Sequence, residues 1–547
     1  VITKSVPNLG KIKVKGQFQL GQIIELFSGE DASVVAARLL TGTAPGSDFP
    51  RADLRVAPTR GTNALLERKG TPVDLSTTKG FESLLEVRDQ RRPDLFELSP
   101  SLSVPVTKRV IGVPGRLDRQ GRELEPLDES ELEDQRESKA VAVAMIHADV
   151  APDHEKRVAE ILRDSGFSEV SVSHEIAPMI RLWPRMETTV ANAYLTPVMG
   201  GFLSSLENAL PRIPISLMTS AGQLKSAEIF RPVDSLLSGP AGGIAGAAAL
   251  ARACGLAQVL TFDMGGTSTD VARIAGEPGY RYEQEIGPVK VLAPAVKIET
   301  VAAGGGSIGQ WRKGGLQVGP ESAGSSPGPA CYGCGGPLTV TDVNLLLGFM
   351  DETRADIPLD RTAAEGRLDE LIQEIGKEMN RGELLEGLRK IAIGHMAEVL
   401  RQVSTRDGYD CRDHTLVAFG GAGPQHACAL ARELGMKRIL VPADAGLLSA
   451  WGLHQAADRE IKVKQILKLL DDSISEELDQ LREGRSVHRS LFELRLKGQD
   501  SSIEIEAGQR ISESELREAF ETRYRELYGD ARPVDREIEW VALRLEL

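Results

Sequence analysis

The sequence is short of cysteine and of basic residues. Five cysteines in 547 residues are too few for a disulfide framework, so we expect a reducing compartment, the cytoplasm. With 65 Lys and Arg against 79 Asp and Glu, the net charge of −14 argues against a protein that coats nucleic acid or an anionic membrane. The uncharged stretch of small and apolar residues at 236–250 is too short to span a bilayer. No signal peptide is found at the start, and because the chain opens with Val1 rather than Met we expect its true N-terminus to be missing or processed.

Several catalytic and binding motifs are also missing. No Walker A sequence is present, which excludes a nucleotide site of the P-loop kind. Ser307 lies in a glycine run without an obvious base, so a nucleophilic triad has no support. No helix-turn-helix, RNA-binding or zinc-finger pattern is found. The residue in excess is glycine, with 55 residues in a chain of ordinary globular composition, long enough for about three or four domains.

Apolar runs followed by helical patterns predict an α/β protein. The run at 141–146 predicts a buried strand, and the amphipathic segment 154–165 predicts the helix after it. A small-residue helix is expected over 244–254, and a buried strand over 258–262. Strands that lead through glycine loops into helices are typical of nucleotide-binding α/β architectures.

The two ends of the chain have different patterns. Near the start, 11–20 alternates like a half-buried strand, and 61–69 predicts a helix capped by Thr62 or Asn63. The acidic segment 124–138 predicts a connection or a solvated helix. In the tail, two alternating runs around 497–502 predict a hairpin, and the spacing of Ser512 and Glu515 predicts a capping box. A last strand is expected over 538–547.

The segment 261–270 carries the strongest chemical signal. Two successive glycines allow backbone N–H groups to approach a phosphate closely, and three hydroxyls add donors. Asp263 and Asp270 flank them, and carboxylates next to phosphate are best explained by a Mg²⁺ ion that bridges the two. A strand-ending turn with polar caps is the alternative, and the paired aspartates favour phosphate. The phosphate candidates are Gly265, Gly266, Thr267, Ser268 and Thr269.

Two further glycine loops are candidate binding segments. Gly420, Gly421 and Gly423 could lie flat against an adenosine, or could form a tight strand–helix joint. His426 after them is a candidate substrate residue, or a helix-cap or core histidine. The run Gly304, Gly305, Gly306 and Ser307 suits close contact with phosphate or substrate, or a hinge or hairpin turn.

The long loop 319–336 holds a pair of cysteines. Such loops inside a compact domain are usually functional. Cys331 and Cys334 have zinc-ligand spacing, but no second pair lies nearby, so a free or redox-sensitive pair is the better interpretation.

Many ungapped motifs between about 55 and 455 resemble the hydantoinase A/5-oxoprolinase family. They include FDMGGTSTDV (262–271), VAAGGGSIG (301–309), VGPESAGSSPGPACYG (318–333), TVTDVNLLLG (339–348), VAFGGAGPQHACALARELGM (417–436) and GLLSAWGL (446–453). Earlier matches are TNALLERKG (62–70), SHEIAP (173–178), TTVANAYLTPV (188–198) and LLSGPAGGIAGA (236–247).

This resemblance implies an α/β actin-like ATPase fold, shared with sugar kinases and heat-shock chaperones, with ATP between two lobes. It divides the chain into an N-terminal hydantoinase A-type lobe (1–182), an ATPase domain (183–460) and a small α+β segment (461–547). It also implies a first phosphate loop of GGTFTD type, which this sequence lacks. From the first lobe, Arg60, Thr62 and Asn63 become candidate substrate contacts.

The resemblance implies an ATP-dependent amidohydrolase that phosphorylates the carbonyl of a cyclic amide, such as 5-oxoproline or a hydantoin. ATP and Mg²⁺ are the implied cofactors, with Asp263 and Asp270 as the catalytic and metal-binding residues. A hydantoinase B-type subunit or domain is the implied partner, in a hetero- or homo-oligomer without nucleic acid or membrane. Two alternatives stay open: the A-type subunit of an acetone- or acetophenone-type carboxylase, and a nucleotide-binding scaffold without turnover.

Overall fold

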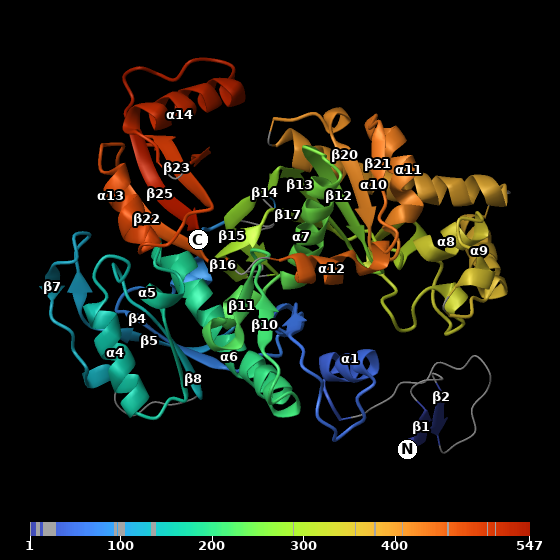
Figure 1. Ribbon diagram of the computed structural model, residues 1–547, viewed down its shortest axis with the longest axis horizontal. Helices are drawn as coiled ribbons and strands as arrows, with labels where there is room; N and C mark the ends of the chain where they lie inside the picture. Colours follow the sequence, from blue (N-terminus) through green and yellow to red (C-terminus); the bar gives the residue numbers. More distant parts are fainter. Residues whose placement is uncertain are drawn as a thin grey trace.

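The structure is a computed structural model, shown in Figure 1. It describes residues 2–6, 11–14, 29–91, 96, 104–132, 138–287, 289–355, 357–376, 379–406, 408–456, 459–499, 501–508 and 510–547. Among these residues, none of the helices combines the length and apolarity that a bilayer crossing requires.

Four parallel strands form the first sheet, in the order β5-β4-β8-β9. They are β4 (Val73–Thr78), β5 (Thr107–Val113), β8 (Ala140–Ala144) and β9 (Glu169–Val172). Valines 141 and 143 of β8 face α4 (Asp153–Asp164), whereas its alanines face α6 (Leu182–Ala209). This alternation places one helix on each face of the sheet. The predicted strand and the helix after it are therefore confirmed.

A small sheet in the order β11-β10-β3 lies beside α6. Its strands are β3 (Leu54–Val56), β10 (Ile215–Met218) and β11 (Leu224–Ser226), with α1 (Ala32–Thr41) and α2 (Arg60–Leu66) nearby. The predicted cap of α2 is wrong. The helix begins at Arg60, and Thr59 occupies the cap position without a side-chain cap bond. The Thr62 hydroxyl instead accepts a hydrogen bond from the backbone of Leu237 (3.1 Å).

The central sheet has the order β14-β13-β12-β20-β21, and β17 pairs with β13. Its strands are β12 (Gln258–Met264), β13 (Thr269–Ala275), β14 (Glu277–Pro278), β17 (Ile298–Val301), β20 (Thr415–Phe419) and β21 (Arg438–Leu440). One face packs on α7 (Ser238–Ala253) and the other on α10 (Arg381–Thr405) and α11 (Gly423–Leu434), as Figure 1 shows. Alternate residues of β12 thus enter two different cores.

The order of strands determines which loops meet. β12 and β20 are parallel neighbours, with Asp263 opposite Phe419 in register. Their carboxyl ends therefore lie at one edge of the sheet, where ligands of open α/β sheets usually bind. The chain returns from β12 as the antiparallel strand β13, where the sequence analysis expected only a glycine turn.

Other elements are the hairpins β15 (Tyr280–Ile286)–β16 (Val289–Val296) and β18 (Ser307–Arg312)–β19 (Gly315–Ser322), with α8 (Val340–Leu346), α9 (Arg361–Ile375) and α12 (Leu448–Gln455). Short elements are β1 (Ile2–Val6), β2 (Lys11–Val14), α3 (Leu84–Val87), β6 (Arg116–Leu117), β7 (Glu123–Glu125) and α5 (Ser173–Ile176). The rest of the strand expected over 11–20 lies outside the described residues. Within 124–138 the described residues hold the end of β7 and a short 3₁₀ turn, Ser130–Leu132.

The C-terminal part forms its own antiparallel sheet, in the order β22-β25-β23-β24. Its elements are β22 (Ile461–Leu469), α13 (Ile474–Arg482), β23 (Arg489–Leu496), β24 (Ile503–Ala507), α14 (Glu513–Tyr528) and β25 (Ile538–Glu546). Its core centres on Phe492, Phe520 and Trp540. The predicted hairpin, the capping box of Ser512 and Glu515, and the last strand are confirmed.

Candidate functional site

Two aspartates face each other at the end of the β12–β13 hairpin. Asp263 and Asp270 are paired across the two strands, next to the last pair before the turn, Met264 and Thr269. The four residues between the strands form a tight turn, closed by a hydrogen bond from the Gly265 N–H to the Ser268 carbonyl (3.1 Å). The glycines and Thr267 are exposed. An exposed glycine turn therefore lies beside a pair of carboxylates.

The electrostatics of this pair favour a bound cation. Burial, and then repulsion from Asp270, raises the pKa of Asp263 to about 7. Burial also raises the pKa of Asp270, although the Thr300 hydroxyl donates a hydrogen bond to it (2.6 Å) and opposes the rise. Two part-buried carboxylates destabilise each other when both are ionised. A divalent cation with oxygen ligands would relieve that repulsion.

Gly420, at the end of β20, lies directly against Asp263. Its φ is +79°, and a Cβ there would be 2.4 Å from Oδ1 of Asp263. The next turn is fixed by a hydrogen bond from the Ala422 N–H to the Met264 carbonyl (3.0 Å). A Cβ on Gly423 would lie 3.2 Å from the Phe262 carbonyl. Gly421 between them is exposed, so the loop that carries the adenosine candidates reaches the carboxylate pair with one face open.

The loop of Gly304, Gly305, Gly306 and Ser307 lies beneath the hairpin turn. It is buried, and the Gly305 and Gly306 N–H groups donate to the carbonyls of Gly265 (3.0 Å) and Gly266 (2.6 Å). A Cβ on Gly304 would come within 2.6 Å of the Thr267 backbone. The buried Thr269 hydroxyl donates to the Ala303 carbonyl, away from the turn. The buried loop and Thr269 thus support the β12–β13 turn from the interior of the protein.

The first-lobe candidates lie in separate environments. Arg60 is paired with Asp31 and is about half exposed. Asn63 is exposed, and the Thr62 hydroxyl contacts the start of α7. The structure connects Thr62 to the site through α7, where a Cβ on Gly243 would lie 3.1 Å from Oδ2 of Asp263.

Some residues at the site were not singled out from the sequence. Thr341 donates from both its backbone N–H and its hydroxyl to the Gly305 carbonyl (2.8 Å each). Gly243 contacts Asp263, and the Ser449 hydroxyl lies beside that glycine. Gly243 and Thr341 fall inside the family motifs LLSGPAGGIAGA and TVTDVNLLLG. The motifs therefore marked both residues, but the sequence alone did not indicate what either residue contacts.

His426 lies in the interior. Its side chain is fully buried, and its Nε2 lies 3.1 Å from Nδ2 of Asn344. Burial, and then the charge of Arg389, lowers the pKa of His426 to about 4. The imidazole is therefore neutral near pH 7.

The cysteine pair has two different environments. Cys331 is buried and Cys334 is exposed, and both are free thiols. Burial raises the pKa of the Cys331 thiol, so it is not a ready nucleophile. Among the described residues, no group of three or more His, Cys, Asp or Glu is placed to hold a metal ion.

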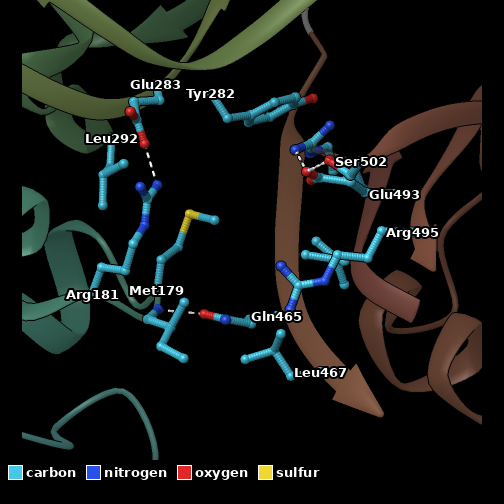
Figure 2. A pocket seen from close by; sticks show the side chains of 14 residues that line it. Met179, Arg181, Tyr282, Glu283, Leu292, Gln465, Leu467, Glu493, Arg495 and Ser502 are labelled. Carbon is cyan, nitrogen blue, oxygen red and sulfur yellow. Dashed lines mark hydrogen bonds and ion pairs between the residues drawn. The ribbon is translucent and has the colours of Figure 1, made fainter. Parts of the chain in front are cut away.

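A cavity of about 610 Å³ lies elsewhere, between the β15–β16 hairpin and the C-terminal sheet (Figure 2). Met179, Leu292 and Leu467 give it apolar walls. Its charged side chains pair within the protein, Arg181 with Glu283 and Arg544 with Glu493. The cavity is lined neither by the β12–β13 turn nor by the glycine loops at 304–307 and 420–423. We therefore place the candidate active site at the pair Asp263 and Asp270.

Comparisons with known protein families match most of the chain. The family model described as hydantoinase/oxoprolinase matches residues 185–462, and that of the hydantoinase/oxoprolinase N-terminal region matches residues 28–166.

Two curated relatives extend this match. 5-Oxoprolinase 1 of Arabidopsis thaliana is 36% identical over 500 aligned residues, covering 80% of this chain and 39% of that protein. The chain thus spans about two fifths of the length of this relative. Caprolactamase subunit alpha of Pseudomonas jessenii is 32% identical over 544 residues, covering 90% of this chain and 77% of that subunit.

Two solved structures share the fold. The crystal structure of the ATP-dependent caprolactamase from Pseudomonas jessenii matches with a TM-score of 0.79 and 30% identity, covering 90% of this chain and 78% of that chain. The nucleotide-free structure of acetone carboxylase matches with a TM-score of 0.68 and 22% identity over the same shares. The expected α/β actin-like ATPase fold is confirmed.

Proposed function

The chain belongs to the hydantoinase/oxoprolinase family, and we propose that it uses ATP to hydrolyse a cyclic amide. One observation carries this proposal: Asp263 and Asp270 face each other at a turn whose two glycines are exposed. Such a turn suits a phosphate chain, and the carboxylate pair suits the cation that accompanies it.

The donor set fits Mg²⁺. Asp263 and Asp270 supply carboxylate oxygens, and burial raises the pKa of both, so a bound cation would stabilise their ionised forms. These two residues would hold the ion directly or through water, because Mg²⁺ keeps several waters in most protein sites. The turn amides, with the hydroxyls of Thr267 and Ser268, would orient the terminal phosphate.

The glycines after β20 would hold the adenosine. Gly421 has open space around its Cβ position, whereas Gly420 and Gly423 pack against Asp263 and the Phe262 carbonyl. The buried loop of Gly304 to Ser307, with Thr269, would act by supporting the turn.

Phosphorylation explains why an amide hydrolase would need ATP. An amide is a poor electrophile, and transfer of a phosphoryl group to its oxygen supplies a leaving group and removes the resonance stabilisation. The chain's own part is to position the phosphate and to balance its charge, which are the main protein contributions in phosphoryl transfer.

The relatives' names support the substrate class. 5-Oxoproline and caprolactam are both cyclic amides, and proteins named for acting on them match this chain. We propose a lactam or hydantoin as substrate, with Arg60, Thr62 and Asn63 as first-lobe contacts.

The chain is proposed to act with a hydantoinase B-type subunit or domain, in the cytoplasm. The relative from Pseudomonas is named a subunit alpha, which supports a partner. We also retain the division into 1–182, 183–460 and 461–547 as a proposal. The separate C-terminal core supports its last boundary.

The test is coupled turnover of the full-length protein with its B-type partner. We expect ATP hydrolysis that depends on one of 5-oxoproline, hydantoins or lactams, without added bicarbonate. Turnover of ketones that requires bicarbonate would instead support the carboxylase alternative. Partner-supported activity that survives both Asp263→Asn and Asp270→Asn would support a scaffold and overturn the proposal.

A further inference from the structure

Asn344 connects α8 to the helix that follows the adenosine candidates. Its side chain is only 2% exposed. Its Nδ2 donates a hydrogen bond to Oε1 of Gln425 (2.8 Å) and lies 3.1 Å from Nε2 of His426. A side-chain amide nitrogen carries two hydrogens. Both are therefore used, one on each of these neighbours in the first turn of α11.

The contact with Asn344 determines the tautomer of His426. Because the Asn344 amide is a donor, Nε2 of His426 must accept, and the ring proton lies on Nδ1. That Nδ1 is buried and has no hydrogen-bond partner among the described residues. His426 is thus a neutral acceptor that holds the second hydrogen of Asn344.

The same contact orients Gln425. Its Oε1 is directed to Asn344, so its Nε2 group must point the other way. Gln425 is half-buried, two residues after Gly423, and its Nε2 has no partner in the described part of the protein. Gln425 thus carries an unused amide donor in the first turn of α11, next to the glycine loop.

The surroundings place the start of α11 near the hairpin turn. A Cβ on Gly305 would lie 2.8 Å from the Thr341 hydroxyl and 4.0 Å from Cβ of Ala422. The start of α8, the supporting loop and the start of α11 therefore converge beside the turn of Gly265 and Gly266.

We propose that Gln425 donates a hydrogen bond from Nε2 to an oxygen of the bound nucleotide, and that Asn344 is its positioning residue. This inference rests on the proposed ATP site. A nucleotide offers acceptor oxygens on its phosphates and ribose. An amide held in one orientation loses less conformational freedom on binding than a free side chain does.

Gln425→Glu gives the sharpest test. Glutamate keeps an oxygen for Asn344, so the fold is preserved, but it replaces the outward donor with a carboxylate oxygen. Calorimetry with MgATP should show affinity at least about tenfold weaker, with an unchanged melting temperature. Gln373→Glu on the exposed face of α9 makes the same charge change and should leave the affinity unchanged.

A double-mutant cycle then tests the positioning role. Gln425→Ala and Asn344→Ala should each weaken MgATP binding several-fold, and the double variant should bind no more weakly than Gln425→Ala alone. Multiplied losses in the double variant would overturn the positioning role.

The outcomes separate the two proposals. If the wild type binds no MgATP, the proposed function fails and this inference fails with it. If the wild type binds and Gln425→Glu binds equally well, only this inference is overturned.

Discussion

Gly420 leaves room for Asp263: a Cβ at position 420 would lie 2.4 Å from Oδ1 of that carboxylate. Real Cβ atoms do not approach other atoms so closely, and the φ of +79° at Gly420 is itself unfavourable for L-residues. We therefore predict that Gly420→Ala displaces Asp263. Stability should fall by about 1–3 kcal/mol, and MgATP affinity should fall roughly tenfold or more. Urea unfolding and calorimetry measure the two effects.

Gly446→Ala is the matched control for this change. Gly446 is exposed, and nothing lies within 4 Å of a Cβ built there. The same substitution at this position should leave nucleotide affinity unchanged. Equal affinity losses in the two variants would show that the contact with Asp263 is not the cause.

The supporting loop gives a second prediction. A Cβ on Gly304 would meet backbone atoms of Gly266 and Thr267 at 2.6–2.7 Å, so Gly304→Ala must push the turn outward. We expect weaker MgATP binding, although position 304 is buried and never faces the ligand. Gly315→Ala, at a site with open space in the β18–β19 hairpin, is the control. Unchanged affinity in Gly304→Ala would mean that the loop does not hold the turn.

A third prediction concerns pH. Burial raises the pKa of Glu187 from 4.5 to about 7, and the nearby charge of Arg88 only partly offsets this rise. The folded state therefore binds this proton more tightly than the unfolded state. The contribution of Glu187 to stability is full below about pH 4.5 and is lost as the pH rises to about 7.

Glu187→Gln tests this sign, because glutamine is neutral at every pH. Relative to the wild type, the variant should gain stability as the pH rises from 5 to 8, by up to roughly 3 kcal/mol. Thermal unfolding at several pH values measures the difference. If the stability of the variant relative to the wild type stayed constant or fell with rising pH, the raised pKa of Glu187 would be contradicted.

Local rules predicted much of the fold. Ser512 and Glu515 have the capping-box spacing, and α14 begins there. The strand and helix over 141–165 follow from an apolar run and an amphipathic period, which need no knowledge of distant contacts. The pair Asp263 and Asp270 stood out because carboxylates beside glycines need a chemical reason.

What sequence reasoning missed depends on tertiary contacts. The run from Gly304 to Ser307 suggested close contact with phosphate or substrate, yet it is buried because the hairpin turn packs on it. The Thr269 hydroxyl looked like a phosphate donor, but the strand pairing directs it to Ala303. Asn344 and Gln425 lie far apart in the chain, and no local period indicates that their side chains meet.

Calorimetric titration of the full-length protein with ATP, with and without Mg²⁺, tests the central claim most directly. We predict Mg²⁺-dependent binding that weakens at least about tenfold in both Asp263→Asn and Asp270→Asn. It should stay unchanged in Asp351→Asn, whose exposed carboxylate caps a short 3₁₀ turn and pairs with Arg354. Absence of heat in the wild type, or equal affinity in all four proteins, would contradict a magnesium–nucleotide site at this hairpin.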